Sequence, residues 1–125
     1  MIDPDQPIRI ADDDQYCVTI SRTIRSFQYI IRLFPSDGAG GFLEGRVIAM
    51  GSNSNPRFTT PGAAIRNSIV QLCVMHGDQP GSSVNEIAAQ LDVVRSDGQV
   101  CPIKTLSIPA SPGSAIFECF AVQFR

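Results

Sequence analysis

The stretch AIFECFAVQF, residues 115–124, contains the clearest strand signal in the chain and decides the predicted fold. Its side chains fall into two alternating sets, with Glu118 as a polar exception on the first face: Ile116, Phe120, Val122 and Phe124, then Phe117, Cys119, Ala121 and Gln123. Successive side chains of a strand point to opposite faces, so this alternation is typical of β-structure. We predict a strand here.

Similar short apolar runs recur along the chain between turns rich in Gly, Pro, Ser and Asp. Residues 16–34 also fit a helical stripe, but their β-branched and aromatic content favours two strands with a break near 22–26. The turn at 35–41 precedes a returning strand over 42–50, in which Gly45 is a candidate β-bulge.

Three further segments carry more specific expectations. Asp97 and Gly98 predict a hairpin between apolar runs, and Pro102 places the second strand at an edge or a bulge. Residues 51–64, GSNSNPRFTTPGAA, are predicted to form a long polar loop that is a candidate contact loop. Residues 65–76 fit a helix and a strand equally well.

One short helix is expected near 84–91, because Ser83 and Glu86 form a capping-box pattern. Together these segments predict a mainly all-β fold: a small antiparallel β-sandwich or barrel of six to eight short strands. With 125 residues the chain has the length of one domain. We divide it into an acidic, extended N-terminal arm over 1–15 and a single β-rich domain over 16–125.

The arm carries the strongest charge signal. Five of the twelve acidic residues of the chain lie in it, with a single base, Arg9: Asp3, Asp5, Asp12, Asp13 and Asp14. The rest of the chain keeps nine bases against seven acids, whereas the whole has a net charge of −2 and a pI of about 5.2. A broadly basic nucleic-acid binder is therefore not expected. The arm has few apolar residues to bury, so we predict that it docks on a neighbouring chain instead of its own core.

The four cysteines, Cys17, Cys73, Cys101 and Cys119, lie in apolar runs and form no CxxC motif. We interpret them as reduced core thiols, with disulfides and a zinc site assembled from distant strands as the alternatives. The only histidine, His76, lacks the sequence signature of a catalytic triad, and no phosphate-binding glycine motif is present. We expect no enzymatic activity, no cofactor and no metal.

Nine of the ten basic residues are arginine. Arginine is enriched at protein interfaces, although a GC-rich genome would produce the same bias. The residues predicted to contact a protein partner are Asp12, Asp13, Asp14, Arg22, Arg25, Arg32 and Arg57.

These observations favour a non-enzymatic structural or assembly protein. Its most concrete form is a small virion component, such as a bacteriophage capsid-decoration or cement protein or a head or tail accessory protein. Its partners would be capsid or shell subunits and copies of itself. The first alternative is a β-barrel or sandwich that binds a small molecule or carbohydrate. The second is a single-stranded nucleic-acid-binding OB-like barrel, because arginines and aromatics interleave over residues 22–34.

The sequence contains neither of the two apolar patterns that direct a chain to or through a membrane. The N-terminus has no apolar segment of the kind that signal peptides contain, and no apolar run reaches the ~18 residues of a membrane span. We expect a protein that is not secreted by a signal peptide and that acts in a virion or in the cytoplasm.

Overall fold

Apolar side chains at every second position build the strands of the computed structural model. The structure describes residues 7–22, 27–52, 56–76, 85–110 and 116–125. Within them it contains eight strands and one helix, in this order: β1 (Gln15–Arg22), β2 (Phe27–Pro35), β3 (Arg46–Gly51), β4 (Arg57–Pro61), α1 (Gly62–Ile65), β5 (Ser68–His76), β6 (Asn85–Val94), β7 (Val100–Ala110) and β8 (Ile116–Gln123).

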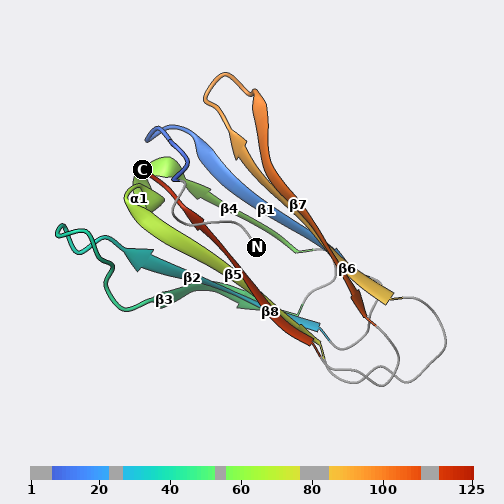
Figure 1. Ribbon diagram of the computed structural model, residues 1–125. Coiled ribbons are helices and arrows are strands. Elements are labelled where there is room, and N and C mark those ends of the chain that lie inside the picture. Colours follow the sequence, from blue (N-terminus) through green and yellow to red (C-terminus); the bar gives the residue numbers. More distant parts are fainter. Residues whose placement is uncertain (1–6, 23–26, 53–55, 77–84, 111–115) are drawn as a thin grey trace.

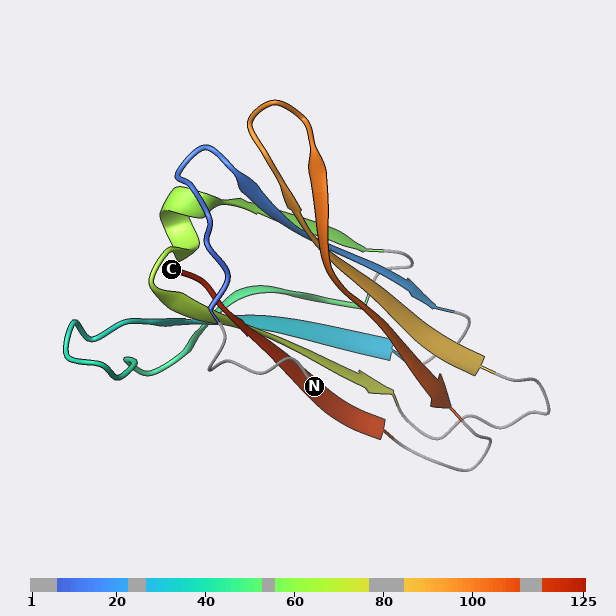
Figure 2. The same cartoon turned by 45° about the horizontal axis from the view of Figure 1, so that its top comes forward.

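The strands form two antiparallel sheets of four, with the orders β4-β1-β6-β7 and β3-β2-β5-β8. The two sheets form the two layers of a sandwich, with α1 and the C-terminal end at one end of it (Figures 1 and 2). The predicted small all-β sandwich is confirmed.

The core lies between the two sheets. Each central strand contributes buried apolar side chains at alternate positions, among them Val18, Ile31, Val74 and Leu91. Tyr16 and Phe124 meet edge to face, with ring centroids 4.9 Å apart. Burial of the Tyr16 phenol in this apolar setting raises its pKa well above the ordinary value.

Residues 85–94 form a strand, so the helix predicted near 84–91 is wrong. Ile87, Ala89, Leu91 and Val93 are all buried, and β6 pairs with β1 on one side and β7 on the other. Burial at every second position, with partner strands on both sides, outweighs a capping pattern worth about 1 kcal/mol. Of that pattern, Ser83 lies outside the described residues.

Two details of the loop predictions are also corrected. Residues 57–64 of the predicted loop belong to β4 and α1, because β1 offers an open edge that β4 pairs with in register. Gly45 precedes β3 and makes no bulge; the register shift lies instead between Ile31 and Arg32 of β2. Gly45 faces the Phe34 ring, which leaves no room for a side chain there.

Other sequence predictions are confirmed. β1 ends at Arg22 and β2 begins at Phe27, as the predicted pair of strands requires, and residues 68–76, for which the sequence left helix and strand open, form a strand. The Asp97-Gly98 turn closes the β6–β7 hairpin, with Gly98 at a φ of 89° and the Arg95 amide donating to the Gln99 carbonyl. Pro102 lies on β7, an edge strand, where the pairing with β6 shifts register.

Cys73 and Cys119 form a disulfide between β5 and β8, so the prediction of four reduced thiols is wrong for this pair. The two residues are direct partners in the strand pairing, with Cα atoms 4.0 Å apart. Sequence spacing alone does not show such a register. Cys17 is a free, buried thiol and Cys101 a free, half-buried one.

The N-terminal segment, defined here as residues 7–14, packs on its own chain. Ile8 pairs in parallel with Phe124, and Ile10 is 1% exposed within the core. The expectation that the arm docks on a neighbour instead of its own core is therefore wrong for this segment. The physical reason is that the open end of the sandwich buries Ile10 and gives its amide a partner at Arg125. Residues 1–6 of the predicted arm lie outside the described residues.

Candidate functional site

The outward face of the β4-β1-β6-β7 sheet is polar. Its described outward positions carry mainly hydroxyl, amide and charged side chains, among them Thr19, Ser21, Gln90, Asp92 and Thr105. The Thr105 hydroxyl donates to Oε1 of Gln90 at 2.6 Å, and Nε2 of Gln90 donates to Asp92 at 3.0 Å. The first hydrogen bond joins β7 to β6 and the second lies within β6, so polar side chains on this face bond to one another as well as to water.

The outward face of the β3-β2-β5-β8 sheet, called here the apolar face, has the opposite character. Its outward positions follow from the register of the buried residues: Gln28, Ile30, Arg32 and Phe34 on β2; Val47 and Met50 on β3; Ile69, Gln71, Cys73 and Met75 on β5; Phe117, Cys119, Ala121 and Gln123 on β8. Of these residues, only Arg32 carries a charge. The Cys73–Cys119 disulfide joins β5 to the edge strand β8 on this side of the sheet.

Several large side chains of the apolar face are open to solvent. Met50 is 67% exposed, Phe117 63% and Val47 47%. Phe42 and Leu43, in the β2–β3 connection that projects beyond the body of the sandwich (Figures 1 and 2), are also exposed. Scattered exposed apolar residues are ordinary, but several large ones on a single sheet face make it a candidate interaction surface, even with Gln28, Arg32, Gln71 and Gln123 among them.

A second feature lies at the end of the sandwich that holds α1. There the N-terminal segment makes a tight turn in which the Asp14 amide donates to the Ala11 carbonyl. The Asp14 carboxylate accepts the Ala11 amide at 2.9 Å and Nη1 of Arg95 at 2.6 Å. The backbone hydrogen bond from Ala11 and the charge and hydrogen bond of Arg95 hold the pKa of this buried carboxyl below its ordinary value, although burial opposes them.

Asp12 pairs with Arg66, the residue after α1, at 2.8 Å. The two ion pairs therefore tie the N-terminal segment to α1 and to the β6–β7 hairpin. α1 approaches this turn closely: the Gly62 amide donates to the Asp14 carbonyl, and a Cβ at Gly62 would collide with the Ala11 carbonyl oxygen.

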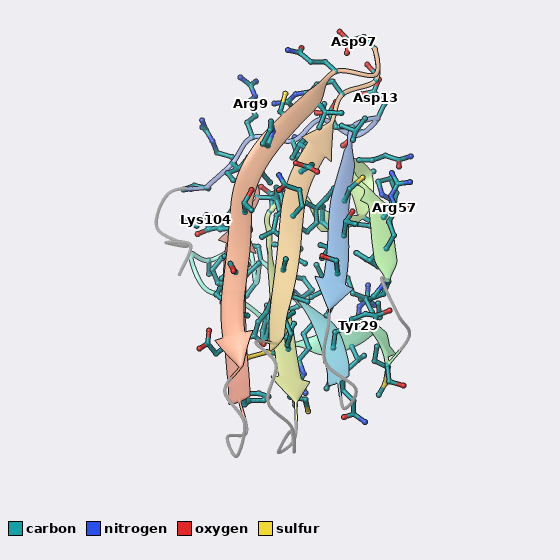
Figure 3. The ribbon with its side chains drawn as sticks, turned by 90° about the vertical axis from the view of Figure 1, so that its right-hand side faces the viewer. Arg9, Asp13, Tyr29, Arg57, Asp97 and Lys104 are labelled. Atoms are coloured by element: carbon teal, nitrogen blue, oxygen red, sulfur yellow. A yellow bond between two sulfur atoms is a disulfide. The ribbon has the colours of Figure 1, made fainter. Side chains whose placement is uncertain are left out.

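A cleft of about 760 Å³, called here the end cleft, opens beside this turn. Four arginines from distant parts of the chain line it together with three residues of the N-terminal segment: Arg9, Arg66, Arg95, Arg125, Ile10, Ala11 and Asp12. Figure 3 shows Arg9 near the end of the molecule that also carries Asp13 and the Asp97 turn. Sequence reasoning missed this cluster, because its arginines lie 29 or more positions apart.

The predicted partner-contact residues are not gathered in one place. Asp12 and Asp14 form the ion pairs just described, and Asp13 is exposed beside them. Arg22 ends β1 in one sheet, whereas Arg32 lies half-buried on β2 in the other.

Arg57 is exposed on the edge strand β4, opposite the edge that carries Lys104 on β7 (Figure 3). Arg25 lies outside the described residues. The contact role of all seven residues stays a prediction.

In the part of the chain that the structure describes, no three His, Cys, Asp or Glu side chains come together as a metal site would require. Over the same residues, no helix has the length and apolar character needed to cross a bilayer. Comparisons with models of known protein families, with curated proteins and with solved structures find no match to this chain.

Proposed function

We propose that this chain is a non-enzymatic assembly protein and that it associates with copies of itself through the apolar face. The observation that carries the proposal is the contrast between the two outward faces of one sandwich. One face carries mainly hydroxyl, amide and charged side chains, whereas the other exposes Met50, Phe117 and Val47 and has Arg32 as the one charged residue among its described outward positions. Exposed apolar area is costly in water, and covering it stabilises an assembly.

A second copy is a suitable partner for this face. In a two-fold arrangement each copy presents the same surface, so an apolar sheet face meets an apolar sheet face. Arg32, half-buried between Val47 on β3 and Gln71 on β5, would lie within such a contact and limit how the two faces can be aligned. The small virion component, with capsid or shell subunits as further partners, is the most concrete member of this functional class and stays part of the proposal.

The experiment is sedimentation velocity of the purified chain over a wide concentration range. We expect the wild type to associate as its concentration rises. The Met50→Glu and Phe117→Glu double variant should remain a monomer, because two charges would be buried without partners. Thr19→Glu, an exposed strand position on the polar face, is the matched control and should associate like the wild type.

Far-ultraviolet circular dichroism of each variant establishes that it is folded before its mass is compared. A wild type that stays monomeric at every concentration would overturn the proposal. So would association that survives the double variant, because the contact would then use another surface.

A further inference from the structure

The hydrogen bonds of the N-terminal segment set two arginines side by side. The Arg125 amide donates to the Ile8 carbonyl at 3.0 Å, and the Ile10 amide donates to the Arg125 carbonyl at 3.1 Å. In a parallel pairing this pattern makes Arg9 and Arg125 directly opposite partners. Opposite residues on neighbouring strands lie about 5 Å apart and project from the same side, so both side chains enter the end cleft together.

Counted over side chains alone, the charges around the end cleft do not balance, because four arginines meet two aspartates. Asp12 neutralises Arg66 and Asp14 neutralises Arg95. Among the residues that the structure describes, neither Arg9 nor Arg125 has an ion pair. Two like charges directly opposite each other destabilise a strand pair unless something offsets them. An anion bound between these two adjacent guanidinium groups would offset their repulsion.

Guanidinium groups bind oxyanions with paired hydrogen bonds of matching geometry. A carboxylate has one negative charge, whereas a phosphate monoester has about 1.5 to 2 at neutral pH, which matches two arginines. The cleft is open to solvent and is much larger than a phosphate group. The exposed Ala11 adds a small apolar part to its wall, whereas the Ile10 side chain is buried in the core.

We propose that the end cleft binds a small organic phosphate, with Arg9 and Arg125 holding the phosphate group and the organic part lying against the wall at Ala11. This site is separate from the apolar face and does not depend on self-association. Arg66 and Arg95 border the site while paired with their aspartates.

The test is isothermal titration calorimetry at constant ionic strength with three probes: phenyl phosphate, inorganic phosphate and acetate. We expect phenyl phosphate to bind most tightly, inorganic phosphate more weakly, and acetate not to bind. The Arg9→Gln and Arg125→Gln double variant should bind phenyl phosphate at least roughly tenfold more weakly, because it loses two charge-assisted contacts. Arg57→Gln, an exposed arginine on β4, is the matched control and should bind like the wild type.

Both variants should fold, because the double variant removes a like-charge pair and Arg57 is exposed; thermal unfolding without ligand checks this. Three results would overturn the proposal. Acetate binding as tightly as phosphate would show a site without preference for a dianion. Equal affinity for inorganic phosphate and phenyl phosphate would show that the organic part of the ligand makes no contact. Unchanged binding by the double variant would place the site elsewhere.

Discussion

Asp14 offers a sharp test of how the N-terminal segment is held. Its carboxylate is almost fully buried, with 4% of the side chain exposed, and it accepts hydrogen bonds from the Ala11 amide and from Arg95. The variant Asp14→Asn keeps the shape of the side chain and removes its charge. It should therefore weaken both hydrogen bonds without opening a cavity.

The size of the effect follows from these two bonds. A hydrogen bond to a charged group contributes about 1.5–3 kcal/mol and a neutral one about 0.5–1.5 kcal/mol, so neutralising the acceptor costs about 1 kcal/mol for each bond. Arg95 is 37% exposed, and solvent screening reduces its share. We expect the free energy of unfolding to fall by about 1–2 kcal/mol at pH 7. For a chain of this length that is a lower Tm by about 4–8 °C.

The pH dependence of this loss has a definite sign. The folded state holds the pKa of Asp14 below its ordinary value of 3.8, so near that pH the unfolded chain binds more protons. The stabilisation is fully present above the ordinary pKa and is lost as the pH falls through the lower, folded value. The difference between wild type and Asp14→Asn should therefore be largest at pH 6–7 and shrink below about pH 4.

Urea unfolding at several pH values measures this difference directly. Asp13→Asn is the matched control, since Asp13 is an exposed neighbour in the same turn, and it should change stability by less than about 0.5 kcal/mol. A difference between wild type and Asp14→Asn that stays the same from pH 7 to pH 3 would refute the reasoning, because it would not come from the charge.

Two further predictions concern the same end of the sandwich. Ile10→Ala should lower the free energy of unfolding by about 2–5 kcal/mol, since Ile10 is 1% exposed in the core; an exposed, dispensable arm would give a loss near zero in urea unfolding. Gly62→Ala should cost at least about 1–3 kcal/mol, because its Cβ would meet the Ala11 carbonyl oxygen. Ala63→Ser, at the exposed next position of α1, is its control, and an unchanged Tm for Gly62→Ala would contradict the close approach of α1 to the turn.

Much of the fold could be predicted from periodicity. Phe120, Val122 and Phe124 are buried as their alternation indicates, and the Asp97-Gly98 turn closes a hairpin because glycine adopts a positive φ at little cost. The helix predicted near 84–91 is wrong because the capping pattern is a local signal, whereas the strand partners of this segment lie far away in the sequence. Pairing with β1 and β7 decides this segment, and those contacts connect distant residues that local patterns do not reveal.

The candidate sites were harder to predict, because each depends on which residues become neighbours. The contrast between the two faces requires the register of every strand: Met50 lies opposite Ile30, and Cys73 opposite Cys119. The end cleft joins residues as distant as Arg9 and Arg125, and only their backbone pairing brings them together. The sequence shows the acidic charge of the N-terminal segment, but it does not show that Arg66 and Arg95 pair with Asp12 and Asp14.

The end cleft and the stability of the N-terminal segment are linked by this geometry. Arg9 belongs to the segment, so a dianion shared by Arg9 and Arg125 would hold the segment against β8 in addition to the hydrogen bonds already present. A ligand that binds only the folded state stabilises it by mass action. Two ionic contacts would then hold the segment: the Asp14–Arg95 ion pair within the chain, and a phosphate bound between Arg9 and Arg125. The first is lost only in acid, whereas the second depends on the concentration of the ligand.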